Sequence, residues 1–353
     1  MKIQSINNNC TSFGSNRKKF DVQGHIGTMY DNGRKVTYTP QNIIDTVSPH
    51  NVKTVLVSSL SGLNALGQDT YCSERASAQE VVSICGNNNV KILPLLSCQP
   101  GITQDTTVAE QILNSNKFYG LKFHPSNTNK AIKDNFEIYS KYITVAEQKG
   151  LPCVFHSVTD GKSDPSEIIK LAEKHPKHPI VLYHVDLASK SEQMTKTIDN
   201  IANSVNTGKS NLFVDISWLT NFWDNAEDNK KTIKYLLEKL GDDRILFGSD
   251  TPITEMGNQE LYGKFTDFIE NTVKDFYTDK PNEAEIALDK IFYNNAEELF
   301  INKKWFNKKT PQTPKTKAIL VCAGIAVAGI AFLATKLIGK ISKTAENPSL
   351  IHK

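Results

Sequence analysis

Eight short apolar runs, rich in β-branched residues, recur along the chain and start about every 32 residues from Phe20 onward. Each has the length and composition of a buried β-strand, and amphipathic stretches of helical period separate them. The predicted strands are Phe20–His25, Lys53–Leu60, Val90–Ser97, Tyr119–His124, Pro152–His156, Pro179–Val185, Asn211–Ser217 and Arg244–Asp250. The predicted helices include Asn135–Lys149, Pro165–His175, Lys190–Asn206 and Asn229–Leu240. Eight alternating units predict an α/β fold, the (β/α)₈ TIM barrel.

A doubly wound open sheet also alternates strands with helices and is the alternative architecture. Such a sheet concentrates its site at one switch point, commonly after a Gly-x-Gly-x-x-Gly turn. No such motif follows any predicted strand here, and polar residues are spread over many strand ends. The pattern therefore favours a barrel over residues 20–300, with Phe265–Phe300 forming two helices that complete or cover it.

Four of the eight histidines and one aspartate stand at the carboxyl end of a predicted strand. Because a parallel barrel gathers its chemistry at that end, these five side chains are expected to converge on one pocket. Three other histidines, His50, His175 and His178, come just before a strand and are expected at the opposite end of the barrel. The converging residues are His25, His124, His156, His184 and Asp250.

The spacing of polar residues on two strands supports a shared site. Gln23 and His25 are two residues apart, so their side chains share one face of the first strand. Lys122 and His124 repeat this spacing on the fourth strand. Neutral imidazoles combined with one carboxylate suit Zn²⁺, Fe²⁺ or Mn²⁺ and bind Mg²⁺ or Ca²⁺ poorly. The pattern predicts a metal or acid-base site.

These motifs and their order resemble the amidohydrolase-related metal-dependent hydrolases of the TIM-barrel amidohydrolase superfamily. In such enzymes the first strand usually supplies His-x-His to a metal, the fifth and sixth strands supply histidines, and the eighth supplies an aspartate. Carried over by position, the resemblance implies metal ligands at His25 and His156, a ligand or acid-base residue at His184, and a ligand or general base at Asp250. The matching stretches are Asp21–Gly27, Gly120–Pro125, the runs into His156 and His184, Phe247–Pro252 and Asn295–Phe300.

Gln23 departs from the family pattern, because it stands where the first ligand histidine is expected. A carboxamide oxygen is a poor zinc ligand, but a catalytic zinc needs only three protein ligands and one open position. The resemblance then implies one divalent transition metal, Zn²⁺ first with Mn²⁺ or Fe²⁺ as alternatives, held by His25, His156 and Asp250. The metal would acidify a bound water and polarise the substrate carbonyl while His184 or Asp250 takes the proton.

The implied function is hydrolysis of a small-molecule substrate that carries an amide, lactone or related carbonyl group. Lys122, His124 and Gln23 are expected to bind it, with Lys122 contacting a substrate carboxylate or pairing with a nearby acid. Two alternatives stay open: decarboxylation or hydration at the same site, and a degenerate, membrane-tethered binding barrel, which Gln23 suggests. Weaker candidates at strand ends are Asp215, Ser217, Asp186, Glu74 and Arg75.

The two ends of the chain differ in composition from the barrel region. Residues 1–19 are rich in Asn and Ser without an apolar segment, which predicts a disordered leader and no secretory signal. A basic linker is predicted at 301–317, then a single apolar helix at 318–341, then a tail at 342–353. The uncharged run Ala318–Thr335 within this helix has just the length to span a bilayer. We therefore expect a C-terminal membrane anchor with the barrel in the cytoplasm; a buried or surface-lying helix is the alternative.

The charge distribution follows the same division. From residue 301 onward ten lysines face one acid, whereas residues 1–300 carry 31 Lys and Arg against 37 Asp and Glu. A mildly acidic body lacks the basic face of a nucleic-acid-binding protein, so no nucleic-acid partner is expected. The six cysteines form no Cys-x-x-Cys pair, which indicates reduced, inert thiols.

Overall fold

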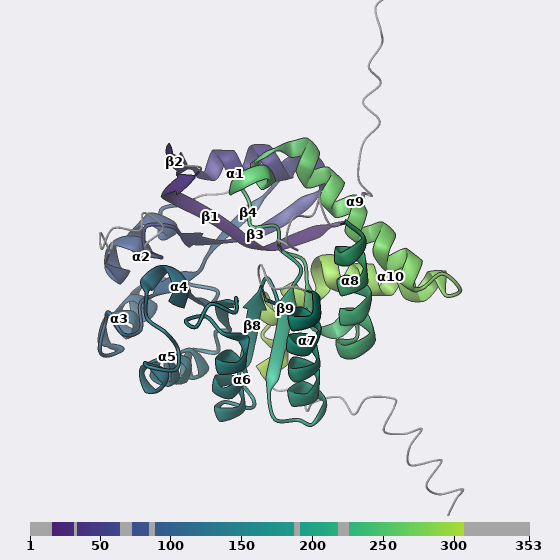
Figure 1. Ribbon diagram of the computed structural model, residues 1–353. Helices are drawn as coiled ribbons and strands as arrows, with labels where there is room; N and C mark the ends of the chain where they lie inside the picture. Colours follow the sequence, from purple (N-terminus) through teal and green to yellow (C-terminus); the bar gives the residue numbers. More distant parts are fainter. Residues whose placement is uncertain are drawn as a thin grey trace, which may run out of the picture. The chain divides into compact units, whose positions relative to one another are not determined.

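Parallel strands form a closed ring in the structure, a computed structural model (Figure 1). It describes residues 16–31, 34–63, 73–84, 89–186, 191–217 and 226–306. The ring strands are β1 (Lys19–Asp31), β3 (Val52–Ser59), β4 (Lys91–Pro94), β5 (Leu96–Cys98), β6 (Leu121–Phe123), β7 (Cys153–His156), β8 (Pro179–Tyr183), β9 (Asn211–Asp215) and β10 (Ile245–Leu246). The predicted TIM barrel is confirmed.

Two sheets make up this ring, in the orders β2-β1-β3-β4 and β10-β9-β8-β7-β6-β5. On one side they join through the chain itself, since β4 runs into β5 across Leu95. On the other side, Val22 N donates to Phe247 O at 3.0 Å and Asp250 N donates to Gln23 O at 3.0 Å, so β1 pairs with the segment after β10. These bonds close the barrel and exclude the open doubly wound sheet.

The first strand is longer than predicted. β1 continues past His25 to Asp31 and pairs in antiparallel fashion with β2 (Arg34–Tyr38), from Gly27 opposite Tyr38 to Asp31 opposite Arg34. The sequence carried a signal for this hairpin, because Asn32-Gly33 between two strand-like runs is a strong turn dipeptide. The hairpin lies beyond the ring, so the eight predicted barrel positions are unchanged.

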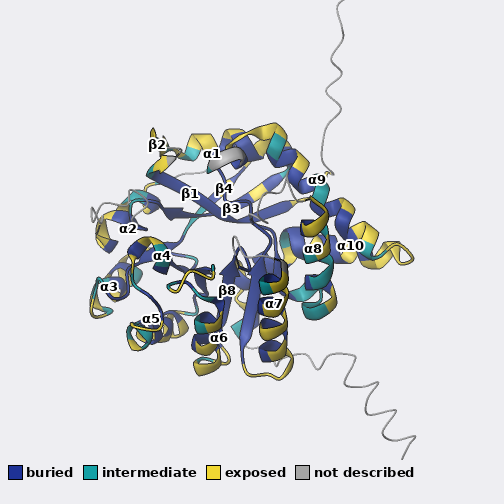
Figure 2. Cartoon of the chain, in the orientation of Figure 1, coloured by how far each residue is buried: buried dark blue, intermediate teal, exposed yellow. Residues whose placement is uncertain are grey.

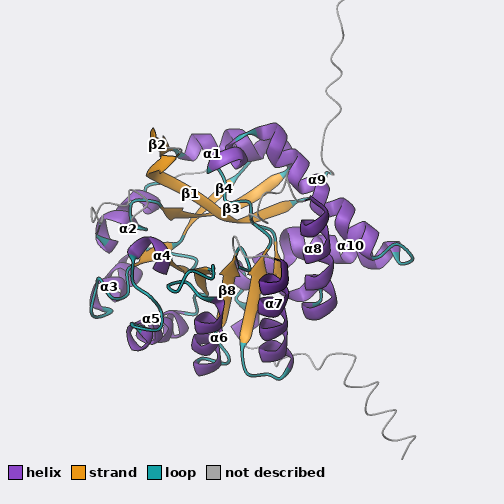
Figure 3. Cartoon of the chain, in the orientation of Figure 1, coloured by secondary structure: helices purple, strands orange, loops and turns teal. Residues whose placement is uncertain are grey.

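Helices surround the strands on the outside (Figure 3). Their buried faces turn toward the ring and their exposed faces turn away from it (Figure 2). Proline at the first or second position starts several of them, where its missing N–H costs nothing, and Gly150 in the left-handed region ends α5. The helices are α1 (Pro40–Val47), α2 (Glu74–Val82), α3 (Thr107–Ser115), α4 (Pro125–Thr128), α5 (Phe136–Lys149), α6 (Pro165–Lys174), α7 (Ser191–Asn206), α8 (Ala226–Leu240), α9 (Gln259–Phe276) and α10 (Pro281–Asp289).

Apart from the apolar layer between the helices and the strands, an apolar cluster fills the inside of the ring and continues into the residues after α10. Phe20 and Phe213 come from the strands, while Phe300 and Trp305 come from the final segment. The Trp305 side chain is 2% exposed, and its ring lies 4.9 Å from the ring of Phe213. The Arg244 guanidinium lies over both rings, 4.7 Å from Phe213 and 4.6 Å from Trp305. Trp305 therefore belongs to the barrel core, although it falls within the segment 301–317 that was predicted to be a basic linker.

The imidazole of His178, directly before β8, provides a pH-sensitive contribution to stability. It is buried, and among the described residues neither ring nitrogen has a hydrogen-bond partner. Burial, with a smaller effect of His175, lowers the pKa of His178 to about 3. Because the folded pKa lies below the unfolded value of about 6.5, the unfolded chain binds more protons between these values. The contribution of neutral His178 to the free energy of unfolding is therefore fully present above about pH 6.5 and is lost as the pH drops toward 3.

Between pH 7 and pH 4.5, we expect the free energy of unfolding of the His178→Phe protein to fall by about 2 kcal/mol less than that of the wild type. Phenylalanine keeps the edge contact with Phe306, whose ring lies 5.7 Å from that of His178, but it takes up no proton. Urea unfolding of both proteins at the two pH values measures the difference. Equal pH dependence of the two proteins would show that His178 is not the group responsible.

The predicted membrane anchor was wrong. In the part of the chain that the structure describes, no helix is both long enough and apolar enough to cross a membrane. The segment 318–341, on which the anchor and the localisation depended, lies outside the described residues, as do 1–15, 307–317 and 342–353. The physical basis was weak, because the uncharged run only just reaches spanning length and is rich in Ala and Gly, which drive insertion weakly.

Candidate active site

The carboxyl ends of the barrel strands bring the predicted site residues into one chain of contacts. Gln23 and His25 come from β1, Lys122 from β6 and His156 from the end of β7. His124, His184 and Asp250 directly follow β6, β8 and the extension of β10. We call this set the strand-end cluster: Gln23, His25, Lys122, His124, His156, His184 and Asp250.

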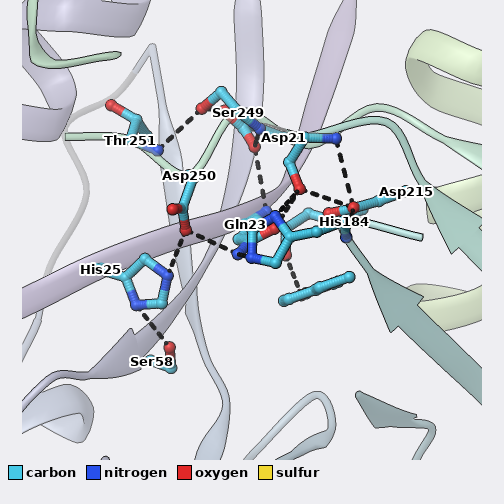
Figure 4. Close-up of polar contacts among 12 residues, drawn as sticks. Asp21, Gln23, His25, Ser58, His184, Asp215, Ser249, Asp250 and Thr251 are labelled. Atoms are coloured by element: carbon cyan, nitrogen blue, oxygen red, sulfur yellow. Dashed lines mark hydrogen bonds and ion pairs between the residues drawn. The ribbon is translucent and has the colours of Figure 1, made fainter. Parts of the chain in front are cut away.

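Asp250 lies between His25 and Gln23 (Figure 4). Its Oδ1 accepts a hydrogen bond from Gln23 Nε2 at 2.7 Å and lies 2.8 Å from His25 Nε2. Within the described residues its other oxygen, Oδ2, has no hydrogen-bond partner. Although burial alone would raise the pKa of Asp250, the charge and hydrogen bond of His25 hold it well below its usual range, and the charge of Lys122 acts in the same direction. Asp250 is therefore an ionised carboxylate with one oxygen held and one oxygen available.

The charge of Asp250 determines the protonation of its neighbours. A carboxylate only accepts hydrogen bonds, so both nitrogens that face Oδ1 must carry a proton. His25 is therefore protonated at Nε2, while its Nδ1 meets the Ser58 hydroxyl at 3.0 Å. For the same reason Gln23 must turn its amide nitrogen, rather than its oxygen, toward Asp250.

His184 is neutral and its tautomer follows from Gln23. Burial lowers the pKa of His184 to about 4. Its Nε2 lies 3.0 Å from Gln23 Nε2 and must accept, so the ring proton is on Nδ1, which lies 2.9 Å from Ser217 Oγ. Ser217 Oγ also lies 2.6 Å from Gln23 Oε1 and 2.7 Å from Asp215 Oδ1. Burial raises the pKa of Asp215 to about 7, so this second aspartate is about half protonated near neutral pH.

The two remaining histidines and the lysine lie beside this network. The His124 and His156 rings stack with their centroids 3.8 Å apart, and His156 meets His184 edge to face at 5.1 Å. The ammonium of Lys122 lies 4.0 Å from the centre of the Tyr183 ring, and the described residues offer it no ion pair. Burial lowers the pKa of Lys122 to about 7, against the opposing pull of Asp250 and Asp215.

The backbone is strained at the two strand ends that carry His184 and Asp250. His184 has φ 72° and Val185 has φ 60°, and Asp250 has φ 70°, all in the left-handed region. Such values cost a non-glycine residue on the order of 1 kcal/mol or more and concentrate at functional sites. Hydrogen bonds hold the strained positions, among them His184 N to Asp215 Oδ1 at 2.7 Å and Asp250 N to Gln23 O at 3.0 Å.

The sequence did not identify Asp21, which accepts hydrogen bonds from residues next to the cluster. It accepts from Gln23 N at 3.1 Å and Ser249 N at 3.0 Å, and from the Tyr262 hydroxyl at 2.9 Å. Burial raises its pKa to about 6. Its signal was the continued alternation Asp21, Gln23, His25 on one strand. Ser58 and Ser249, which had no such signal, were missed as well.

The weaker candidates divide into two groups. Asp215 and Ser217 belong to the hydrogen-bond network of the cluster. Asp186 instead anchors loops through Thr159 N at 2.8 Å and Thr197 Oγ1 at 2.9 Å. Glu74 and Arg75 contact residues outside the cluster. Glu74 accepts hydrogen bonds from Gln99 N and the Tyr142 hydroxyl, and the exposed Arg75 donates one to Gln111.

The donor set of the cluster does not fit the expected metal ion. Nε2 of His25 carries a proton, and Oδ1 of Asp250 already accepts from two nitrogens. His156, the third expected ligand, is stacked on His124 and lies against His184. Among the described residues there is no group of three or more His, Cys, Asp or Glu side chains that could hold a metal ion.

Comparison with known proteins gives a family match and a fold match. The amidohydrolase family model matches residues 67–301. An amidohydrolase from Burkholderia multivorans is 12% identical, with a TM-score of 0.56 over 80% of this chain and 99% of that one. A probable 2-pyrone-4,6-dicarboxylic acid hydrolase from Acinetobacter baumannii is 14% identical, with a TM-score of 0.54 over 80% and 99%.

A third similar structure is 2,6-dihydroxybenzoate decarboxylase from Rhizobium, 15% identical, with a TM-score of 0.53 over 80% of this chain and 98% of that one. At these identities the structural likeness shows the fold alone. Curated protein sequences give no significant match. The family model covers about two thirds of the chain, and its range includes the strand ends that carry His124, His156, His184 and Asp250 but begins after Gln23 and His25. The chain belongs to the amidohydrolase family.

Proposed function

We propose that the strand-end cluster hydrolyses an anionic lactone or another ester-like carbonyl compound, with Asp250 as the general base. The observation that carries the proposal is the pair of unlike oxygens on this carboxylate. Oδ1 is held by two nitrogens, whereas Oδ2 has no partner among the described residues. A base needs this arrangement, because one oxygen fixes the orientation while the other receives a proton. Family membership supports an enzyme with a small-molecule substrate.

In the proposed step a water molecule bound to Oδ2 attacks the carbonyl carbon and gives its proton to Asp250. The C–O bond of the lactone or ester then breaks, and the proton passes to the leaving oxygen. His25 and Gln23 keep Asp250 in place throughout, because their N–H groups stay on Oδ1. The Lys122 ammonium supplies positive charge for a substrate carboxylate or for the developing oxyanion.

The strength of the base favours an ester-like substrate over an amide. A carboxylate whose pKa lies well below its usual range is a weak base, and general-base catalysis weakens as the pKa of the base falls below the working pH. Members of this superfamily usually bind a divalent metal, which would offset a weak base. Because the donors here do not fit Zn²⁺ or its relatives, we assign no step to a metal. Without a metal and with a weak base, hydrolysis requires a substrate whose carbonyl carbon is intrinsically electrophilic, as in an ester or lactone.

The first test offers the protein six-membered lactones that carry no, one or two carboxylates. A pH indicator measures the acid that hydrolysis releases. We expect turnover of the carboxylated lactones and little of the plain lactone, because only the former reach Lys122 with a negative charge. The fold neighbours named as a 2-pyrone-4,6-dicarboxylic acid hydrolase and a decarboxylase both have acidic compounds in their names. Release of CO₂ in place of a ring-opened acid would favour decarboxylation.

Lys122→Met is expected to lower kcat/KM for a carboxylated lactone by about 100-fold, the loss of one charge-assisted contact. Methionine keeps most of the side-chain volume but removes the ammonium. The effect on an uncarboxylated lactone should be below about 5-fold, because that substrate offers no anion to lose. Steady-state kinetics on both substrates separates the two, with Lys170→Met on the exposed face of α6 as control. Equal losses on both substrates would remove Lys122 from anion binding.

A further inference from the structure

We propose that the side-chain amide of Gln23 takes the place of a metal ion in this centre and links Asp250 to His184 by hydrogen bonds. This inference goes beyond the reaction proposed above and holds whichever carbonyl compound is cleaved. Gln23 is then a positioning residue that acts through Asp250 and His184. It was predicted to bind substrate, yet both ends of its amide meet protein groups.

The nitrogen of Gln23 has two protons and meets two acceptors. One is Asp250 Oδ1 at 2.7 Å and the other is His184 Nε2 at 3.0 Å. A carboxylate oxygen and an imidazole nitrogen are also the atoms that would bind a transition metal. Asp250 Oδ1 and His184 Nε2 therefore both direct a lone pair at the amide nitrogen of Gln23, and both atoms have a hydrogen-bond partner without an ion.

The oxygen of Gln23 locks the amide in this orientation. Oε1 lies 2.6 Å from Ser217 Oγ, which also lies 2.9 Å from His184 Nδ1. Ser217 therefore connects the far side of His184 to the far side of Gln23, and the three side chains form a closed hydrogen-bonded ring. A flipped amide would place an oxygen against the Asp250 carboxylate, where two acceptors repel. The ring also requires that His184 carry its proton on Nδ1.

The charge near the centre agrees with a neutral residue in the metal position. A divalent ion would bring two positive charges close to Asp250, but Gln23 brings none. Burial lowers the pKa of Lys122, and the charges of Asp250 and Asp215 act in the opposite direction and raise it. A buried lysine, which sits over the Tyr183 ring rather than in an ion pair, balances the buried carboxylate.

If the amide excludes the ion, a ligand at residue 23 should admit one. Gln23→His supplies an imidazole in place of the NH₂ group, and Gln23→Glu supplies a carboxylate of the same shape. Each variant removes the amide NH₂ group that donates to Asp250 Oδ1 and His184 Nε2. Gln99→His is the matched control, because Gln99 is also a buried glutamine near a strand end but its Nε2 donates to Gly62 O at 2.7 Å.

The experiment uses the full chain, loaded with two equivalents of ZnCl₂ and then desalted, and measures bound zinc and melting temperature with and without a chelator. We expect fewer than about 0.1 equivalents in the wild type and in Gln99→His, and about one in Gln23→His and Gln23→Glu. The chelator should lower the melting temperature of the two position-23 variants only. Adding Asp250→Asn to Gln23→His should reduce its zinc at least about 5-fold, because one ligand is lost.

Two results would overturn the proposal. One is about one equivalent of zinc in the wild type, removed by the chelator. The other is a folded Gln23→His and Gln23→Glu pair that both stay free of zinc. Should neither variant fold, nitrogen NMR of the wild type decides: the ring proton of His184 belongs on Nδ1, and a proton on Nε2 would contradict the closed ring. None of these measurements needs turnover, so failure of the proposed hydrolysis would leave their meaning unchanged.

Discussion

Asp250→Asn is expected to lower hydrolysis by about 1000-fold or more while leaving the fold intact, a loss in the range seen when a general base is removed. The asparagine oxygen can still accept from Gln23 and His25, so the network around it is retained. The nitrogen replaces Oδ2, which leaves no lone pair for the proton of the attacking water. Kinetics on a carboxylated lactone and a thermal melt of both proteins measure the two parts of this expectation.

A matched control for this variant is Asp186→Asn. Asp186 is also a buried aspartate after a barrel strand, but it holds Thr159 and Thr197 rather than a cluster residue. We expect its kcat/KM within about 5-fold of the wild type. If Asp250→Asn kept more than about a tenth of the activity, Asp250 would not be the base.

Trp305→Ala is expected to cost about 3–5 kcal/mol of unfolding free energy, the usual range for removing a large aromatic side chain from a core. The indole ring is 2% exposed and packs on Phe213 and on the Arg244 guanidinium. Its loss would remove one aromatic contact from each of them and leave a cavity beside them. Urea unfolding of the two full-length proteins measures the difference.

Lys304→Ala is the control, because Lys304 is adjacent but exposed and makes a surface ion pair with Glu298. It should change the unfolding free energy by less than about 0.5 kcal/mol. By the same reasoning, a chain ending at residue 300 should be much less stable than one ending at residue 308. A Trp305→Ala protein within about 1 kcal/mol of the wild type would remove Trp305 from the core.

The barrel could be read from the sequence because its evidence is local and repeated. Each strand needs an apolar run and each helix an amphipathic one, and eight such units leave few architectures open. The position of the site followed from the same pattern, since polar residues at strand carboxyl ends must meet in a parallel barrel. The β1–β2 hairpin was missed because the pattern was followed only as far as His25.

The hydrogen bonding inside the site could not be read in this way. Whether Gln23 binds substrate, weakens a metal site or replaces the metal depends on which atoms face its amide, and spacing along a strand does not report that. Asp21 and Ser217 matter through contacts with residues far away in the chain. Trp305 was assigned to the linker because its neighbours are lysines and asparagines, although its own burial decides its role.

The left-handed backbone at His184, Val185 and Asp250 affects how this protein can change over generations. Asparagine and glycine adopt that conformation more easily than valine or histidine, so replacements there can relieve strain while they remove function. A laboratory selection that rewards thermostability alone would therefore tend to replace His184, Val185 and Asp250. A selection for turnover would instead retain His184, Val185 and Asp250, although their backbone conformation costs stability.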